Sequence, residues 1–272
     1  ASREATSRLY RNTRDGKFVD VTREAGAGRA GWGNGVCAGD IDNDGFEDLF
    51  VTYWGDNALF RNTGPGKFDE IAAKAGLVGT TKEWSSGCTF LDYDRDGYSD
   101  LFVAAYQKFD LAKAPLPGKG TTCEWKGMPV FCGPRGLPFG SAKLFRNPGN
   151  NTFEDVTSKS HISEANGFYA FTAVAADLNE DGWTDIYVAS DSTPSLFFRN
   201  NKDGTFREIA TETGIAFNEH GFEQGGMGVA VGDFDGNGKL DLIKTNFAGD
   251  HPNVYQNLGK GIFEDVVIRA GL

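Results

Sequence analysis

Four short acidic segments carry oxygen-bearing side chains at a spacing that suits divalent-cation binding. Each reads D-x-[DN]-x-[DN]-G-x-x-D-[LI], and the copies begin at Asp40, Asp92, Asp177 and Asp233. Side chains at positions 1, 3, 5 and 9 and the main-chain carbonyl at position 7 can surround one ion with hard oxygens, of which Ca²⁺ takes about six to eight. The glycine at position 6 allows the sharp turn that gathers them. The predicted ligands are Asp40, Asp42, Asp44, Phe46, Asp48, Asp92, Asp94, Asp96, Tyr98, Asp100, Asp177, Asn179, Asp181, Trp183, Asp185, Asp233, Asp235, Asn237, Lys239 and Asp241.

Calcium is the predicted ion, at about four sites. Clustered carboxylates repel one another unless a cation lies among them, and Mg²⁺ keeps several waters and seldom uses an all-protein cage. The loops are not EF-hands, because position 12 would need a glutamate and holds Val51, Val103, Val188 or Lys244. The alternative is four Asx-rich turns without metal. Four matching copies favour calcium over that alternative.

These loops also contain much of the chain's acidity. The chain has 38 acidic and 27 basic side chains and a formal net charge of −11, and fourteen of the acidic side chains are loop aspartates. No basic stripe appears in the sequence, which excludes a nucleic-acid binder because phosphate recognition needs clustered Lys and Arg. Asn179 and Asn237 lower the ligand charge of the third and fourth loops. We therefore expect these two loops to bind calcium more weakly than the first two.

Short strands must position the loops. A second element, of the type Leu-Phe-Arg-Asn, ends at Asn12, Asn62, Asn147, Asn200 and Asn257, and each copy precedes a turn and a further strand-like segment such as Phe18–Val21. A strand of small residues precedes every acidic loop and a more apolar strand follows it. One unit thus has four strands in slightly more than 50 residues, which is typical of a β-propeller blade. The alternative is a β-sandwich with similar turns, which the five-fold recurrence disfavours.

The predicted fold class is an all-β propeller of four full blades and one half blade. The predicted units are a half blade over 1–28 and blades over 29–80, 81–165, 166–222 and 223–272, with an insertion over 106–142 in the second blade. The chain of 272 residues has 37 glycines and no run of 18 apolar residues, so no membrane span is expected. Four and a half blades do not close a ring. We therefore expect this to be a segment of a longer propeller, or one that another element completes.

The four cysteines divide into two pairs with different expectations. Cys123 and Cys132 lie nine residues apart in the insertion, and a disulfide between them is predicted. Cys37 and Cys88 lie three and four residues before their loops, and this offset of one places their side chains on opposite strand faces. They are therefore expected to be two buried thiols. A disulfide indicates an extracellular or periplasmic location.

No catalytic motif is found, so the chain is not expected to be an enzyme. His161, His220 and His251 lie in different units, and no metalloprotease, nucleophile-elbow or phosphate-loop motif is present. Glu219, His220 and Glu223 form the nearest approach to an acid/base cluster. A polar loop at the propeller rim is the favoured interpretation of that cluster.

The repeats resemble the FG-GAP (VCBS) repeats of integrin α-subunit propellers. The segments Gly31–Val36, Phe131–Pro138 and Asp191–Pro194, together with the Leu-Phe-Arg-Asn and Glu-Ala-Gly elements, look more closely like the cartilage acidic protein / ASPIC-UnbV family. The resemblance covers essentially the whole chain. It implies a seven-bladed, extracytoplasmic, calcium-loaded propeller, of which these would be middle blades. The family's C-terminal ASPIC/UnbV segment is absent from this sequence.

Two functions from different classes follow. The favoured function is a non-catalytic calcium-binding propeller that serves as a protein-interaction or cell-surface adhesion module, whose partner is a protein or the missing blades. The alternative is a carbohydrate-binding or carbohydrate-active protein of the lyase or dehydratase type. Its glycan would stack on Trp54, Trp84, Tyr106 or Trp125, although most such rings fill the space between blades.

Overall fold

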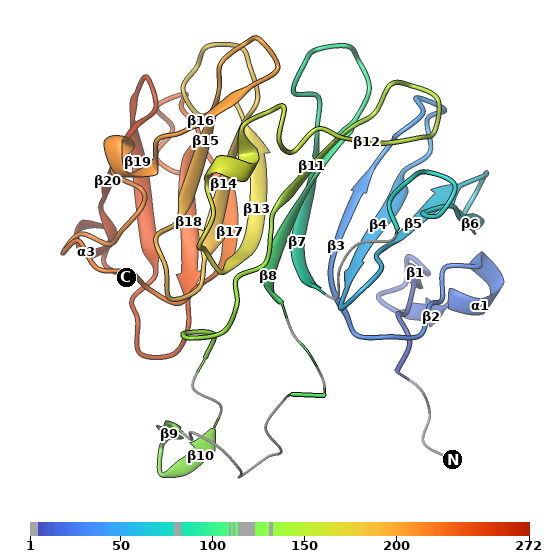
Figure 1. Cartoon of the computed structure of the whole chain (residues 1–272), viewed down its shortest axis with the longest axis horizontal. Helices are drawn as coiled ribbons and strands as arrows, with labels where there is room; N and C mark the ends of the chain where they lie inside the picture. The colour runs from blue at the N-terminus through green and yellow to red at the C-terminus, as the bar shows by residue number, and fades with distance from the viewer. Residues whose placement is uncertain (1–4, 79–82, 109, 111, 114–122, 131–132) are drawn as a thin grey trace.

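Six antiparallel sheets are present in the computed structural model of the chain, which describes residues 5–78, 83–108, 110, 112–113, 123–130 and 133–272. Four sheets have four strands each and stand side by side along the molecule (Figure 1). In chain order their strands are β3 (Gly33–Gly39), β4 (Asp48–Tyr53), β5 (Ala58–Asn62) and β6 (Phe68–Glu70); β7 (Glu83–Leu91), β8 (Asp100–Lys108), β11 (Lys143–Arg146) and β12 (Glu154–Asp155); β13 (Ala170–Ala176), β14 (Asp185–Ser190), β15 (Leu196–Asn200) and β16 (Phe206–Glu208); and β17 (Gly226–Gly232), β18 (Asp241–Asn246), β19 (Asn253–Gly259) and β20 (Ile262–Asp265).

The remaining elements are short. β1 (Tyr10–Asn12) pairs with β2 (Phe18–Asp20), and the insertion contributes the hairpin of β9 (Cys123–Trp125) and β10 (Met128–Val130). Single helical turns follow the outer strands: α1 (Thr22–Ala25), η1 (Ile162–Glu164), α2 (Ala210–Thr213) and α3 (Val267–Ala270).

Each four-stranded sheet packs face to face on the next, as the blades of a propeller do. Successive residues of the second and third strands point to opposite faces of the sheet, and large apolar side chains lie on both faces. Each sheet can therefore pack against the blade before it and the blade after it. The first interface contains Phe50, Leu101 and Phe145, and equivalent clusters fill the next two interfaces. This arrangement of four-stranded sheets confirms the predicted all-β propeller fold.

The first strands of neighbouring blades approach closely, which explains their small residues. β3 lies against β7, β7 against β13, and β13 against β17. A Cβ atom on Gly35 would lie 2.3 Å from the carbonyl oxygen of Ser86, and one on Gly87 would lie 2.8 Å from that of Phe171. Contacts this short are forbidden to a side chain, so only glycine permits this inter-blade distance.

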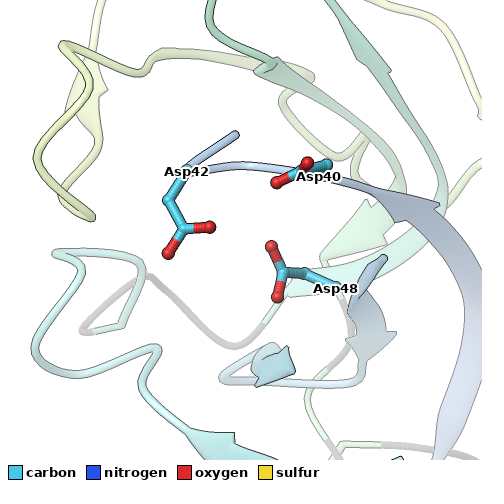
Figure 2. Close-up of side chains that lie close together, drawn as sticks. All are labelled: Asp40, Asp42 and Asp48. Carbon is cyan, nitrogen blue, oxygen red and sulfur yellow. The ribbon is translucent and has the colours of Figure 1, made fainter. Parts of the chain in front are cut away.

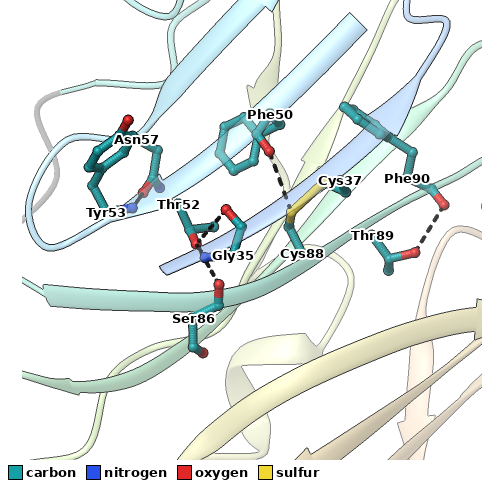
Figure 3. The surroundings of a disulfide bond; sticks show 10 residues. All are labelled: Gly35, Cys37, Phe50, Thr52, Tyr53, Asn57, Ser86, Cys88, Thr89 and Phe90. Carbon is teal, nitrogen blue, oxygen red and sulfur yellow. Dashed lines mark hydrogen bonds between the residues drawn. A yellow bond between two sulfur atoms is a disulfide. The ribbon is translucent and has the colours of Figure 1, made fainter. Parts of the chain in front are cut away.

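One prediction about the cysteines was wrong. Cys37 and Cys88 form a disulfide between β3 and β7, with their Cα atoms 5.8 Å apart (Figure 3). The two side chains do lie on opposite faces of their sheets, as expected. However, β3 and β7 belong to different blades, so these two faces are turned toward each other. Cys37 pairs with Phe50 on the face toward the second blade, and Cys88 pairs with Val103 on the face toward the first blade. Opposite faces of successive blades are the faces that meet. The predicted Cys123–Cys132 disulfide lies outside the described residues, because Cys132 is not among them.

A lysine occupies a core position of the fourth blade where the other three blades have valine. Lys244 is 1% exposed, and its Nζ atom lies 5.9 Å from the ring centroid of Tyr255. Burial lowers the pKa of Lys244 to about 8, an effect that the charges of Asp265 and Asp250 oppose. The folded chain therefore binds fewer protons than the unfolded chain between about pH 8 and the unfolded pKa of about 10.4. Stability from this group rises as the pH rises through that window.

Replacing Lys244 with methionine should stabilise the protein at pH 7. We expect a gain of about 2–3 kcal/mol, because the variant no longer buries an ammonium group. Urea unfolding at pH 7, 9 and 10 measures it, and the difference between variant and wild type should shrink as the pH rises. The exposed Lys159→Met variant is the control. A destabilising Lys244→Met substitution would contradict the assignment of a desolvation cost to this site.

Candidate calcium loops

The four acidic loops join the first and second strands of each blade, at the end of the molecule opposite the β9–β10 hairpin (Figure 1). In the first loop the N–H groups of Asp44 and Gly45 donate to the carboxylate of Asp40 at 3.2 and 2.8 Å, and that of Phe46 donates to Asp44 at 2.9 Å. Asn43 and Gly45 have φ values of 58° and 87°. The two left-handed residues fold the chain back, so position 6 needs glycine.

The same internal bonds recur in the other three loops. The position-1 carboxylate accepts from the N–H groups at positions 5 and 6, and the position-5 side chain accepts from the N–H group at position 7. Positions 4 and 6 are left-handed in every copy. The position-1 aspartates are Asp92, Asp177 and Asp233, and the position-7 donors are Tyr98, Trp183 and Lys239. Their predicted role as carbonyl ligands, like that of Phe46, stays a prediction.

Acidic side chains converge in three of the loops. Carboxylate oxygens of Asp40, Asp42 and Asp48 lie within 4.8 Å of one another and face a shared space (Figure 2). Corresponding groups in the second and fourth loops are Asp92, Asp94 and Asp96, and Asp233, Asp235 and Asp241. In the third loop, where Asn179 stands at position 3, no such acidic triplet forms among the described residues.

One oxygen of the first loop fits a cation particularly well. Oδ1 of Asp42 is buried and has no hydrogen-bond partner among the described residues. A buried carboxylate oxygen without a donor is unfavourable unless a cation compensates it. The donor set consists of hard oxygens, which suits Ca²⁺.

The aspartate at position 9 is buried in every loop and links the loop to the blade. In the second loop, Asp100 accepts from the N–H groups of Tyr93 at 3.1 Å and Asn147 at 2.8 Å. Burial raises the pKa of Asp100 and Asp185 to about 7, and it also raises the pKa of Asp48. Backbone hydrogen bonds oppose the shift, and neighbouring carboxylates add to it. These charged groups are therefore unfavourable until a cation joins them.

Polar and basic side chains on or just after the third strand contact the loops, a role that sequence analysis did not assign. Arg61 donates to Asp42 at 2.5 Å and to Asp44 at 3.3 Å, and Arg146 contacts Asp94 and Asp96 at 2.6 and 2.5 Å. In the third loop Lys202 lies 3.2 Å from Asp181, and in the fourth Gln256 donates to Asp235 at 2.5 Å. The recurrence of Arg in the Leu-Phe-Arg-Asn element could have indicated this contact from the sequence.

The asparagine of the same element ties neighbouring blades together. Asn147, Asn200 and Asn257, here called the clasp asparagines, each donate from Nδ2 to a carbonyl of their own loop and to a carbonyl of the preceding blade's loop. The cross-blade acceptors are the position-2 carbonyls of Ile41, Tyr93 and Leu178, at 2.7, 2.9 and 2.9 Å. Each clasp asparagine also donates its backbone N–H to the position-9 aspartate of its own loop. One residue therefore connects two acidic loops.

The residues considered for catalysis make polar contacts at the surface. Glu223 lies 3.1 Å from Arg135 of the insertion, and Nε2 of His220 lies 3.6 Å from Glu219. His161, the residue before η1, contacts Glu164 of that helical turn. These partners fit the polar rim that the sequence suggested.

Within the described ranges, no helix has the length and apolar character needed to cross a membrane.

Comparison with known proteins assigns most of the chain to one kind of repeat. The model of the FG-GAP-like repeat matches residues 1–51, 40–103, 130–188 and 177–243. Cartilage acidic protein 1 of Xenopus tropicalis is 26% identical over 261 residues, covering 88% of this chain and 35% of that protein. Integrin alpha-4 of Xenopus laevis is 32% identical over 125 residues, covering 41% of this chain and 12% of that protein. The chain thus spans about a third of the length of the cartilage acidic protein that it matches.

A solved structure also aligns along the chain. It is that of an Agrocybe aegerita lectin, described as recognising non-reducing terminal N-acetylglucosamine. It has 16% sequence identity, a TM-score of 0.48, and coverage of 99% of this chain and 69% of that chain.

Proposed function

The chain belongs to the FG-GAP-like repeat family, and from this premise we propose that it is a non-catalytic, calcium-binding β-propeller unit that serves as an extracytoplasmic interaction or adhesion module. Its relatives include an integrin α-subunit and cartilage acidic protein 1. The Cys37–Cys88 disulfide supports an extracellular or periplasmic location, since such compartments maintain disulfides.

The observation that best supports calcium binding is the repeated loop conformation, in which carboxylates converge. Asp40, Asp92, Asp177 and Asp233 would hold one ion each, together with the side chains at positions 3, 5 and 9. Bound calcium would supply the positive charge that buried Asp48, Asp100 and their equivalents lack. The loops would then anchor the start of each second strand and, through the clasp asparagines, the neighbouring blade.

Calcium titration should reveal two classes of site. Loops one and two carry four carboxylates each and loops three and four carry three, so the first pair should bind more tightly because the ligand charge is higher. Isothermal titration of the metal-free chain measures the classes. Asn179→Asp and Asn237→Asp should each raise the affinity of one weak site about tenfold, whereas Asn34→Asp, at the end of β3 away from the loop, should change neither class. A single class of equal sites would contradict the proposed order.

We propose the units 1–28, 29–80, 81–165, 166–222 and 223–272 as a half blade and four blades of a seven-bladed ring. A protein partner or further blades would complete it. The apolar clusters support this division, because each of them is built from the facing sides of two successive units.

A glycan is the second candidate ligand. Trp32 and Trp54 contact each other with ring centroids 5.8 Å apart and planes tilted by 46°, at the end opposite the acidic loops, and Trp32 is half exposed. An exposed indole face suits stacking on a sugar ring. A glycan-array screen of the chain separates this function from protein adhesion.

A further inference from the structure

A lysine and an asparagine lie side by side in the core of the fourth sheet. Lys244 of β18 and Asn253 of β19 are directly opposite each other, and β20 lies on the other side of β19 (Figure 1). Directly opposite residues of an antiparallel pair face the same side of the sheet, with Cβ atoms about 4.5–5.5 Å apart. Both side chains are fully buried. The lysine amine and the asparagine amide therefore share the face that packs on the third blade, to which Leu242 also belongs.

The other three four-stranded sheets have different pairs at this register, namely Val51 with Ala58, Val103 with Lys143, and Val188 with Leu196. The lysine of the second sheet is paired with a carboxylate, because Nζ of Lys143 lies 3.1 Å from Asp155. Among the described residues, Nζ of Lys244 has no hydrogen bond and no ion pair, and it lies 5.9 Å from the ring centroid of Tyr255. A buried amine without a paired charge is unfavourable in its charged form. This position therefore favours chemistry of the neutral amine.

Polar groups hold the amide of Asn253 at both of its ends. Its Oδ1 accepts from Nδ2 of Asn246 at 2.9 Å, and its Nδ2 donates to Oδ2 of Asp265 at 2.6 Å. The carboxylate fixes the orientation of the amide, because only the nitrogen end can donate to it. A donor on the oxygen stabilises the negative charge that develops there when a nucleophile attacks the carbon. A carboxyl group beside the nitrogen can deliver a proton to it as it leaves.

We propose that Lys244 and Asn253 form an intramolecular isopeptide bond in the folded chain. The neutral Nζ amine attacks Cγ of Asn253, and Nδ2 of Asn246 stabilises the charge that develops on the oxygen. Asp265 accepts a proton from the attacking nitrogen and gives it to Nδ2 of Asn253. The Nζ–Cγ bond forms, the Cγ–Nδ2 bond breaks and ammonia leaves. An amine and a primary amide thus become a secondary amide, and the reaction needs no oxidant, cofactor or second substrate.

The surroundings of Lys244 determine how much of its amine is neutral. Burial lowers the pKa of Lys244 to about 8, and the charges of Asp265 on β20 and Asp250 in the turn after β18 oppose that shift. Tyr255 and, from the facing sheet, Tyr187 are neutral neighbours, because burial raises the pKa of both phenols. Most of the amine is therefore neutral at pH 9 and charged at pH 6. The bond should form faster at pH 9.

The reaction uses none of the acidic-loop residues, so it is independent of calcium binding. It does change what Lys244 contributes to stability, because the bonded nitrogen no longer carries a charge. The gain expected for Lys244→Met therefore applies to comparison with wild-type protein whose amine is still free. The intact mass of the wild type identifies that form.

Mass spectrometry of the whole chain tests the proposal. Purified protein is kept at pH 6 and at pH 9, and its intact mass is followed with time. We expect the wild type to lose the mass of one ammonia, faster at pH 9, and we expect no loss in a sample kept unfolded in urea. Trypsin should then fail to cleave after Lys244. It should release residues 240–260 as one peptide that is lighter by one ammonia, with fragment ions that locate the link between Lys244 and Asn253.

Variants separate this reaction from other losses of ammonia. Lys244→Arg keeps a positive charge but has no neutral amine, so its mass should not change. Succinimide formation at an Asn–Gly pair such as Asn166–Gly167 also releases ammonia, but it would occur equally in this variant. Asp265→Asn should slow the reaction about a hundredfold, as expected for loss of a group that transfers a proton. Asp69→Asn, on the exposed outer strand of the first sheet, is the matched control and should react as the wild type does.

An unchanged wild-type mass at pH 9 would overturn the proposal. An equal loss of ammonia from the wild type and Lys244→Arg, or normal tryptic cleavage after Lys244, would overturn it as well. An Asp265→Asn variant that reacts at the wild-type rate would refute the role given to Asp265.

Discussion

Replacing Asp100 with alanine is expected to lower the free energy of unfolding in calcium by about 3–5 kcal/mol. Asp100 is fully buried, and its two oxygens accept from the N–H groups of Tyr93 and Asn147. The substitution leaves both donors without an acceptor, at about 1–3 kcal/mol each. It would also remove one of the ligands proposed for the second loop. Asn147 in turn holds Ile41 of the first loop, so the loss should spread to the neighbouring blade.

The measurement is urea unfolding with calcium and with a chelator. The exposed Asp69→Ala variant is the control and should change stability by less than about 0.5 kcal/mol. Without calcium the cost of Asp100→Ala should fall, because burial already makes the charged carboxylate unfavourable in the metal-free chain. An equal cost in both conditions would argue against an ion in the second loop.

Removing the Cys37–Cys88 disulfide is expected to lower the free energy of unfolding by about 4 kcal/mol. The two cysteines are 51 residues apart, and a cross-link of that span restricts the unfolded chain by about this amount. The bond also joins the first strands of adjacent blades, where Cys88 is buried beside Phe50. Loss of the bond should therefore loosen the first blade from the second.

The double variant Cys37→Ala, Cys88→Ala provides its own control when reductant is added. Reductant should destabilise the wild type to near the level of the variant and should leave the variant unchanged. Urea midpoints with and without reductant measure this, and peptide mapping of the non-reduced protein identifies the bond. A wild-type midpoint that reductant does not move would contradict a stabilising inter-blade disulfide.

These two predictions describe one property of the blade array. Each blade contacts only its neighbours, so its stability depends on the interfaces on either side. The clasp asparagines, the disulfide and the apolar clusters are the interface contacts, and the acidic loops lie at one end of all of them. Calcium at one loop should accordingly stabilise the blade that follows it as well as its own.

Local patterns in the sequence were sufficient for the fold class and the loop positions. The nine-residue acidic motif specifies its own turn, because its internal bonds join residues two to five positions apart. The repetition of four strands with one loop then indicates a blade, since alternating apolar residues require a neighbour on both faces. The structure confirms that fold, and the loops of Asp40, Asp92 and Asp233 each bring three acidic groups within 4.8 Å of one another. Their role as ligands stays a prediction.

Only the tertiary structure decided which distant residues meet. Cys37 pairs with Cys88, Asn147 reaches Ile41, and Lys244 is buried beside Tyr255, although nothing near them in the chain distinguishes these partners. Strand periodicity assigns a side chain to one of two faces, but it does not say which residue of the next blade lies opposite. That choice depends on how two sheets stack and how closely their glycine-rich first strands approach, and both are properties of the packed blades.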